Sequence, residues 1–285
     1  NAKTKSKILE IEKISKNLKK IANIGIRLNP NTDAKTLSQI STGRKENKFG
    51  VSEKNFLKLL QYVKNSKYLH LKCLSVHIGS QITSNKPYEK MLRVLERVIK
   101  KTNFKFEYIA LGGGMGINYE KSQSKINLKN YSLKIKQFQK KYKSKIIFEP
   151  GRFIIGNSGI LITKIIYIKE GYKKNFIILD AAMNDLMRPA LYKAYHQIIP
   201  GRINNKKSKK IYEFVGPICE STDKFSTIEK FQELHEKDLL IICDVGAYGM
   251  SLSSNYNLRT KPAELLIKNS RVKIINQRQK LKDLI

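Results

Sequence analysis

Two patterns of hydrophobic positions divide the chain. Up to about residue 150, short apolar runs alternate with longer segments in which apolar residues recur every three or four positions. The short apolar runs are typical of buried parallel strands, and the three- or four-residue spacing is typical of amphipathic helices. We therefore predict helices over residues 6–22, 53–66, 88–101 and 132–143, and strands over residues 24–28, 71–78, 108–111 and 145–149. This alternation predicts βαβ units around a parallel sheet.

After Gly151 the apolar runs become short and β-branched, and helical spacing is scarce. This pattern favours a mainly antiparallel second domain. We predict its strands over residues 160–169, 175–180, 210–215, 239–244 and 264–269. The predicted domains are residues 1–158 and residues 159–285.

The four strand–helix units are half of an eight-stranded barrel, and a half barrel leaves both edge strands unpaired. Two explanations remain open: the sheet is an open one, or the first half of a barrel lies on a segment that precedes Asn1. The chain does not begin with Met and runs directly into a helical pattern, as a chain cut within a longer protein would.

Composition narrows the choice of partners. The net charge of +33 suggests nucleic acid binding, but the basic residues are mostly lysines spread over the whole chain, whereas specific phosphate contacts favour arginine. A biased genome explains this charge better than a binding surface, so we expect no specific nucleic acid partner. No apolar run is long enough to predict a membrane span. The three cysteines have no metal-ligand spacing, so we expect no metal and a cytoplasmic location.

Polar and glycine-rich strings follow the predicted strands of the first domain. They are His77–Gln81 (HIGSQ), Gly112–Gly116 (GGGMG) and Glu149–Arg152 (EPGR). Parallel α/β folds place their active sites at the carboxyl ends of the strands, and glycines let backbone N–H groups approach an anion closely. Taken singly, each string has a plainer explanation: a tight turn, a hydrogen-bonded core histidine, or a carboxylate that caps a turn.

Taken together and in this order, the strings resemble the barrel of the fold-type III, pyridoxal-phosphate-dependent decarboxylases. Further strings resemble the diaminopimelate decarboxylase family within that group, and the likeness covers almost all of residues 5–280. These strings are RLNPN (27–31), STGRKENKFG (41–50), RPALY (188–192), GPICESTD (216–223) and DVGAYG (244–249). The resemblance implies an α/β plus β fold: the second half of an alanine racemase-like (β/α)8 barrel, followed by a mainly antiparallel β-domain.

The resemblance also implies roles for individual residues around pyridoxal phosphate. His77 would stack on the cofactor ring, Ser80 would lie near the phosphate, and Glu149 would keep the pyridine nitrogen protonated. The glycine run and the residues that follow Glu149 complete the cofactor site: Gly112, Gly113, Gly114, Pro150, Gly151 and Arg152. Arg152 would also clamp a substrate carboxylate, and Tyr248 would reach both phosphate and substrate.

For the substrate, the resemblance assigns a carboxylate grip to Arg188 and Tyr192 and the distal ammonium to Glu220. Cys219 would donate the proton that replaces the lost carboxylate. In the family these last two residues come from the partner subunit, which implies a homodimer with shared active sites. The plainer alternatives are a small buried cysteine and surface ion pairing by Arg188 and Tyr192.

The implied reaction is the decarboxylation of meso-2,6-diaminopimelate to L-lysine and CO₂, the last step of lysine biosynthesis. The family's Schiff-base lysine, in a Tyr-Ala-x-Lys motif, is not found in these residues, so we expect the 285-residue chain alone not to bind pyridoxal phosphate as an internal aldimine, which puts its turnover in doubt. Two alternatives remain: a decarboxylase acting on ornithine, arginine or a carboxylated polyamine, and a noncatalytic basic binding or regulatory homologue.

Overall fold

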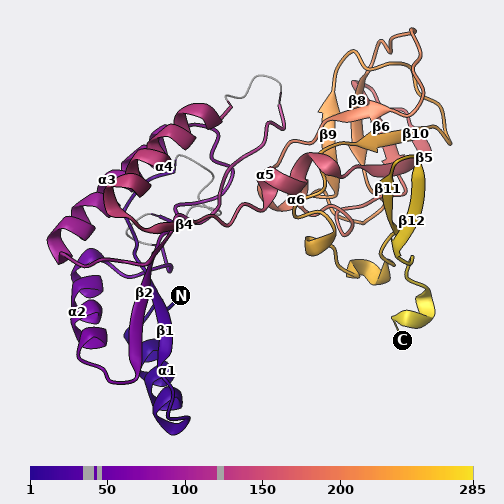
Figure 1. Cartoon of the computed structure of the whole chain (residues 1–285). Helices are drawn as coiled ribbons and strands as arrows, with labels where there is room; N and C mark the ends of the chain where they lie inside the picture. The colour runs from indigo at the N-terminus through magenta and orange to yellow at the C-terminus, as the bar shows by residue number, and fades with distance from the viewer. Residues whose placement is uncertain (35–41, 44–46, 121–124, 285) are drawn as a thin grey trace. The chain divides into compact units, whose positions relative to one another are not determined.

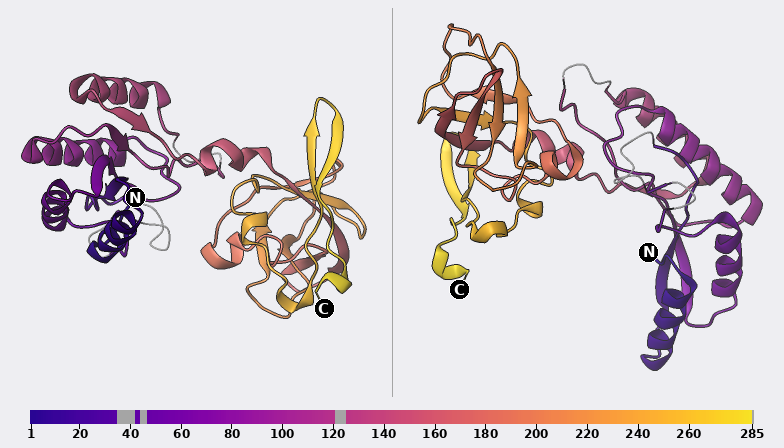
Figure 2. Two further views of the ribbon diagram at one scale, coloured as in Figure 1. Left: turned by 60° about the horizontal axis from the view of Figure 1, so that its bottom comes forward. Right: turned by 180° about the vertical axis from the view of Figure 1, so that it is seen from behind.

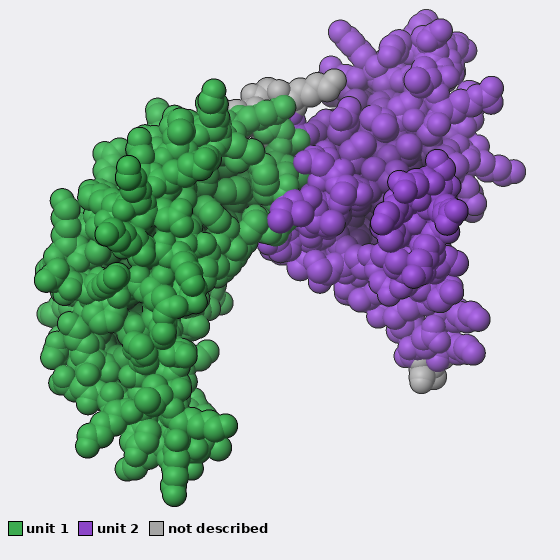
Figure 3. Space-filling model, in the orientation of Figure 1, with its two compact units in different colours: residues 1–118, 122–153 green, residues 119–121, 154–285 purple. Residues whose placement is uncertain are grey.

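A computed structural model describes residues 1–34, 42–43, 47–120 and 125–284. The chain divides into two compact units (Figure 3), the first of residues 1–118 and 122–153, the second of residues 119–121 and 154–285. The predicted domain boundary after residue 158 lies a few residues beyond this division. Of the predicted string at 41–50, residues 41 and 44–46 lie outside the described residues.

The first unit is a four-stranded parallel sheet whose strands are paired in chain order. The strands are β1 (Ala22–Arg27), β2 (Leu69–Ser75), β3 (Tyr108–Ala110) and β4 (Lys145–Ile147). Helix α1 (Lys5–Asn17) precedes β1, and the three crossovers are α2 (Glu53–Lys64), α3 (Lys86–Thr102) and α4 (Leu128–Tyr142). Right-handed crossovers between successive neighbours place these helices on one face of the sheet, as Figures 1 and 2 show.

The core of this unit lies between the helices and the sheet. Phe56, Leu74, Met91, Leu95 and Ile109 are all completely buried there. They occupy the apolar positions that predicted the helices and strands, so the spacing along the chain identified the faces that pack together.

The first predicted helix was too long. It ends at Asn17, because Lys19 adopts a left-handed conformation with φ 51°. Leu18 and Ile21 continue the helical spacing of apolar residues but are 62% and 66% exposed. Strand β1 consequently begins at Ala22, two residues earlier than predicted.

The second unit contains a six-stranded sheet of order β7-β10-β5-β6-β8-β9. Its neighbours are antiparallel except for β6 and β8, which are parallel. The strands are β5 (Leu161–Lys169), β6 (Lys174–Leu179), β7 (Ile198–Pro200), β8 (Ile211–Val215), β9 (Lys224–Ile228) and β10 (Leu239–Ile242). A separate hairpin joins β11 (Glu264–Lys268) to β12 (Arg271–Asn276).

The sequence pattern did not predict β7, β9 or β12. Strand β7 has three residues and ends in Pro200, and β9 reads Lys-Phe-Ser-Thr-Ile, in which three of the five positions are polar. Two short helices, α5 (Arg152–Ile155) and α6 (Arg188–Tyr192), were also missed. Helix α6 lies in the long connection between β6 and β8, and this connection carries several of the predicted substrate residues.

Candidate active site

The carboxyl ends of β2, β3 and β4 bring the three predicted strings of the first unit together. Gly113 N–H donates to Nδ1 of His77 over 3.1 Å, and Glu149 N–H donates to the carbonyl oxygen of Gly112 over 2.9 Å. Ile82 N–H donates to the carbonyl of Gly114 over 2.9 Å. The strings therefore form one rim at the edge where parallel sheets hold ligands.

His77 is neutral at ordinary pH. Burial, together with the nearby charges of Arg27 and Lys3, lowers the pKa of His77 to about 4. Because Nδ1 accepts the Gly113 N–H, the single ring proton must lie on Nε2. Its backbone carbonyl is held as well, by the Arg27 guanidinium at 3.2 Å and the Thr42 hydroxyl at 3.0 Å. The result is a neutral imidazole in a fixed orientation.

The glycines of the 112–114 loop are required by close backbone approaches. Gly114 has φ 87°, and a Cβ atom there would lie 2.1 Å from the carbonyl oxygen of Gly79. A Cβ atom at Gly113 would lie 2.0 Å from the carbonyl oxygen of Glu149. Any other residue would push the rim apart. One amide predicted to face an anion, that of Gly113, is already engaged by His77.

Charged groups complete the rim of the first unit. Partial burial lowers the pKa of the half-buried Arg27 guanidinium, and the negative charge of the exposed Glu149 side chain acts in the opposite direction. Arg152, which is 7% exposed, donates from Nη2 to Oγ of Ser80 over 3.3 Å. The two residues predicted near the phosphate and the substrate carboxylate are thus in contact.

In the second unit, Arg188 begins α6 and is 5% exposed. Its Nη1 donates to Nε2 of His196 over 2.5 Å, and its Cζ lies 4.4 Å from the centre of the Tyr119 ring. The predicted alternative, a surface ion pair, does not describe this environment. Tyr192 is half-buried at the last residue of α6.

The predicted acid–base loop at 216–223 is held by Asp223. Its carboxylate accepts the backbone N–H groups of Met183 at 2.7 Å and Ile218 at 2.8 Å, which ties the loop to the segment that precedes α6. Cys219 and Glu220 project from this loop and are exposed, so Cys219 is not a small buried residue. Hydrogen bonds from the Tyr256 and Thr222 hydroxyls lower the pKa of Glu220. Glu220 is therefore held as an anion.

The DVGAYG segment packs against the turn that follows α5. A Cβ atom at Gly246 would lie 2.0 Å from the carbonyl oxygen of Ile155, and Asn157 donates to Oδ1 of Asp244 over 2.6 Å. Tyr248 adopts φ 59° and is 44% exposed. A large side chain in the left-handed region is strained, and such strain is concentrated at functional sites.

Three residues of this site had no signal in the sequence. Tyr256 binds Glu220, while His196 and Tyr119 surround Arg188. Tyr119 is 69 residues from Arg188 along the chain, and His196, one of the four histidines in the chain, belongs to no motif. Only the tertiary structure brings them together.

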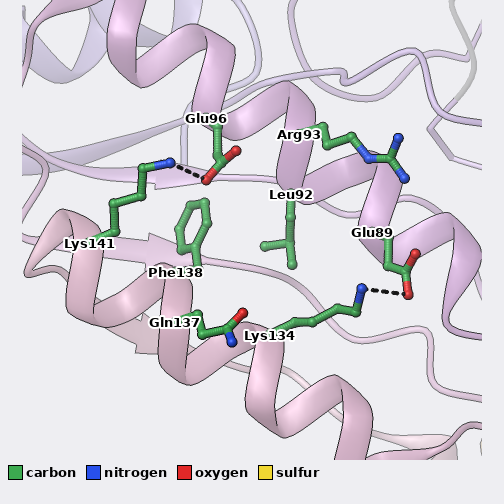
Figure 4. Close-up of a pocket in the computed structure, with 8 residues that line it drawn as sticks. All are labelled: Glu89, Leu92, Arg93, Glu96, Lys134, Gln137, Phe138 and Lys141. Carbon is green, nitrogen blue, oxygen red and sulfur yellow. Dashed lines mark hydrogen bonds and ion pairs between the residues drawn. The ribbon is translucent and has the colours of Figure 1, made fainter.

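A hollow on the outer face, between α3 and α4, is unrelated to this chemistry (Figure 4). Ion pairs cross it from Lys134 to Glu89 at 3.2 Å and from Lys141 to Glu96 at 2.9 Å. None of the predicted site residues lines it. Its lining residues are Glu89, Leu92, Arg93, Glu96, Lys134, Gln137, Phe138 and Lys141.

The described residues have neither a group of potential metal ligands nor a helix long and apolar enough to cross a bilayer. The rim of the first unit does suit a phosphorylated aromatic cofactor. It offers a neutral imidazole, a tightly packed glycine loop, and a carboxylate beside an arginine. A Cβ atom at Gly151 would meet nothing within 4 Å, so the EPGR turn leaves open space on the rim.

This combination of a βα barrel rim and a β-domain defines the class of pyridoxal-dependent decarboxylases. The family model for their pyridoxal-binding domain matches residues 2–156. The diaminopimelate decarboxylase of Aquifex aeolicus is 38% identical over 98% of this chain and 67% of that protein. The chain belongs to the diaminopimelate decarboxylase family, whose members are carboxy-lyases.

Solved structures agree. The diaminopimelate decarboxylase of Helicobacter pylori, complexed with L-lysine, superposes with a TM-score of 0.91 at 37% identity, over 99% of this chain and 71% of that one. The diaminopimelate decarboxylase of Methanocaldococcus jannaschii, in co-complex with L-lysine, superposes with a TM-score of 0.91 at 35% identity. The match covers 100% of this chain and 67% of that one. The predicted fold class, part of an alanine racemase-like barrel followed by a β-domain, is confirmed.

Proposed function

We propose that the native protein carrying this chain decarboxylates the D-centre of meso-2,6-diaminopimelate to give L-lysine and CO₂, with pyridoxal phosphate held on the rim of the first unit. One observation in the second unit carries the choice of substrate. The unit carries both a buried guanidinium, Arg188, and a carboxylate held as an anion, Glu220, so each site of a homodimer would receive one of each, Arg188 from one chain and Glu220 from its partner. Such a pair suits a substrate that has both a carboxylate and an ammonium group away from the reacting carbon.

The other predicted substrates fit less well. Ornithine and a carboxylated polyamine offer a cation at the distal end but no carboxylate there, so they would forgo the charge-assisted hydrogen bonds that Arg188 can donate. The relatives that match at 36–39% identity are diaminopimelate decarboxylases. A noncatalytic basic homologue would have no need of the ordered hydrogen bonds around His77, Arg152 and Glu220.

The residues that would hold the cofactor are those of the rim. His77 would stack on its ring, Ser80 and the glycines would lie near its phosphate, and Glu149 would face its pyridine nitrogen. Pro150 and Gly151 shape the turn beside it, and the resemblance to the family assigns Tyr248 a contact with the phosphate. When bound, pyridoxal phosphate supplies a protonated ring that accepts the electron pair left by the departing carboxylate.

The protein's own groups carry the remaining tasks. Glu149, an acceptor, would keep a proton on the pyridine nitrogen. Arg152 and Arg188 would bind carboxylates, with Tyr192 beside Arg188. Cys219, exposed on its loop, would donate a proton to the carbon that lost CO₂, and Glu220 would bind the distal ammonium. We expect Cys219 and Glu220 to serve the partner's site in a homodimer. The family's Tyr-Ala-x-Lys motif, whose lysine links the cofactor, does not occur in these residues.

The test is turnover by the purified native protein. We expect CO₂ and L-lysine from meso-diaminopimelate, measured with a coupled lysine assay and by mass spectrometry. Ornithine, arginine and carboxyspermidine, offered at the same concentration, should react at least 100-fold more slowly, because each lacks the distal carboxylate and its hydrogen bonds to a charged group, a loss of about 3 kcal/mol. Faster turnover of any of them overturns the substrate assignment. No turnover of any amino acid, with cofactor bound, favours the noncatalytic alternative.

A further inference from the structure

His196 is buried next to Arg188, and both of its ring nitrogens are occupied. It is 2% exposed, its Nε2 is 2.5 Å from Nη1 of Arg188, and its Nδ1 is 2.8 Å from the carbonyl oxygen of Cys243. The Tyr119 ring stands edge-on to the imidazole, with ring centres 5.1 Å apart. A histidine with two defined partners and an aromatic neighbour has one orientation.

The chemistry of these partners fixes the tautomer. A carbonyl oxygen can only accept, so Nδ1 must carry the proton. A guanidinium can only donate, so Nε2 must offer its lone pair. The imidazole is therefore neutral and protonated on Nδ1, and it receives the Arg188 N–H without adding a second positive charge.

Arg188 is held on a second side by Tyr119. Its Cζ lies 4.4 Å from the centre of that ring, a distance at which a guanidinium is attracted to the ring face. An arginine side chain otherwise has many rotamers, and fixing them in advance removes that entropy cost from ligand binding. The two contacts thus prepare the guanidinium before any substrate arrives.

The histidine also joins two parts of the site. Cys243, whose carbonyl accepts from Nδ1, immediately precedes the DVGAYG segment that ends at Gly249, whereas Arg188 begins α6. Any displacement of residue 243 moves the imidazole, and through it the guanidinium.

We infer that His196 is a positioning residue that presents Arg188 to the carboxylate at the distal end of the substrate. This inference rests on the proposed function, in which Arg188 binds that carboxylate. His196 touches neither the reacting carbon nor the cofactor in this role, so it should affect recognition of the distal carboxylate and leave the chemical step unchanged.

Two substitutions of His196 test the roles of its two ring nitrogens one at a time. In His196→Asn the amide nitrogen can replace Nδ1 and keep the bond to Cys243, but residue 196 no longer accepts from Nη1 of Arg188. In His196→Gln the amide oxygen can replace Nε2 and accept from Arg188, while the bond to Cys243 is lost. His196→Phe removes both bonds and keeps the ring. His235→Asn, on an exposed histidine of the same unit, is the matched control.

The readout is equilibrium binding of two probes to the cofactor-loaded native protein, measured by calorimetry. L-lysine carries the carboxylate that Arg188 would bind, and 1,5-diaminopentane lacks it. We expect His196→Asn and His196→Phe to weaken the binding of L-lysine on the order of 10–100-fold, which corresponds to the loss of a hydrogen bond to a charged group. The Kd of 1,5-diaminopentane should stay within about twofold of its value for the unsubstituted protein. The Kd of L-lysine for His196→Gln should lie within about threefold of its value for the unsubstituted protein.

Kinetics should agree: KM for meso-diaminopimelate rises in His196→Asn and kcat stays close to its original value. Equal weakening of both probes, or unchanged L-lysine binding in His196→Asn, overturns the positioning role while the proposed function stands. If the unsubstituted protein neither binds L-lysine nor turns over diaminopimelate, the proposed function fails instead.

A measurement on the unsubstituted protein guards against variants that do not fold. Ring ¹⁵N chemical shifts of His196 should show a protonated Nδ1 and an unprotonated Nε2, and the Nε2 resonance should move when L-lysine binds but not when 1,5-diaminopentane binds. A proton on Nε2, or equal shifts with both probes, contradicts the inference.

Discussion

The packing of the glycine loop against Glu149 can be tested by a substitution that adds one methyl group. In Gly113→Ala the new Cβ atom would lie 2.0 Å from the carbonyl oxygen of Glu149 and 2.9 Å from its carbonyl carbon. Both are backbone atoms, so no side chain can rotate to make room. The loops after β3 and β4 must separate by more than about 1 Å to reach an ordinary contact distance.

The cost follows from this separation. Overpacking of a filled site costs about 1–3 kcal/mol. The same movement strains the bond from Glu149 N–H to Gly112, now 2.9 Å, and that from Gly113 N–H to His77, now 3.1 Å. Losing one of them adds about 0.5–1.5 kcal/mol. We therefore expect a loss of about 2–4 kcal/mol in the free energy of unfolding.

Gly151→Ala is the matched control, because a Cβ atom there meets nothing within 4 Å and should cost no more than about 0.5 kcal/mol. Thermal unfolding of the cofactor-free native proteins, followed by circular dichroism, should lower Tm by roughly 4–16 °C for Gly113→Ala and by roughly 2 °C or less for Gly151→Ala. Equal shifts for the two variants would refute the reasoning, since the same methyl group would then cost the same with and without a clash.

Three further predictions concern the site. The pKa of His77 is about 4 in the folded chain and near 6.5 in the unfolded chain. Its contribution to the free energy of unfolding is therefore fully present above pH 6.5 and falls by about 3 kcal/mol as the pH drops toward 4. Urea unfolding at several pH values should show this pH dependence, and His77→Asn should remove most of it. Tyr256→Phe removes a hydrogen bond from Glu220 and should raise KM for meso-diaminopimelate more than it lowers kcat, whereas equal changes would argue against a binding role. Mixing Cys219→Ala protein with Glu149→Ala protein should restore activity in mixed dimers, and no recovery despite proven subunit exchange would rule out a cysteine supplied by the partner.

Much of the fold followed from the spacing of apolar residues. Helices α2 and α3 of the first unit were predicted because each buries one continuous apolar face, which Phe56 and Leu95 mark. The short strands β7 and β9 were missed because β7 ends in Pro200 and β9 is mostly polar, so neither forms an apolar run. The end of α1 was misplaced because the left-handed turn at Lys19 occurs without the usual glycine.

The candidate site was predicted in its strings but not in its supports. His77, the glycines and Glu149 follow strands directly, so the sequence places them on one rim. Tyr119 and Tyr256, which contact Arg188 and Glu220, are distant along the chain and carry no motif. His196 binds Arg188 only because α6 ends in a left-handed turn at Lys193 that returns the chain. Such contacts depend on the tertiary path, which apolar spacing does not encode.

The one parallel pair in the second sheet has a consequence for the order of folding. Strands β5 and β6 are joined by a short turn, whereas β6 and β8 meet only after the chain has passed through residues 180–210. Closing the longer loop costs more entropy and is repaid only when the distant strand docks. The segment with Arg188 and His196 is the interior of that loop. The substrate end of the site should therefore acquire its shape late, after the hairpin has formed, and refolding followed by hydrogen exchange should protect β5 before α6.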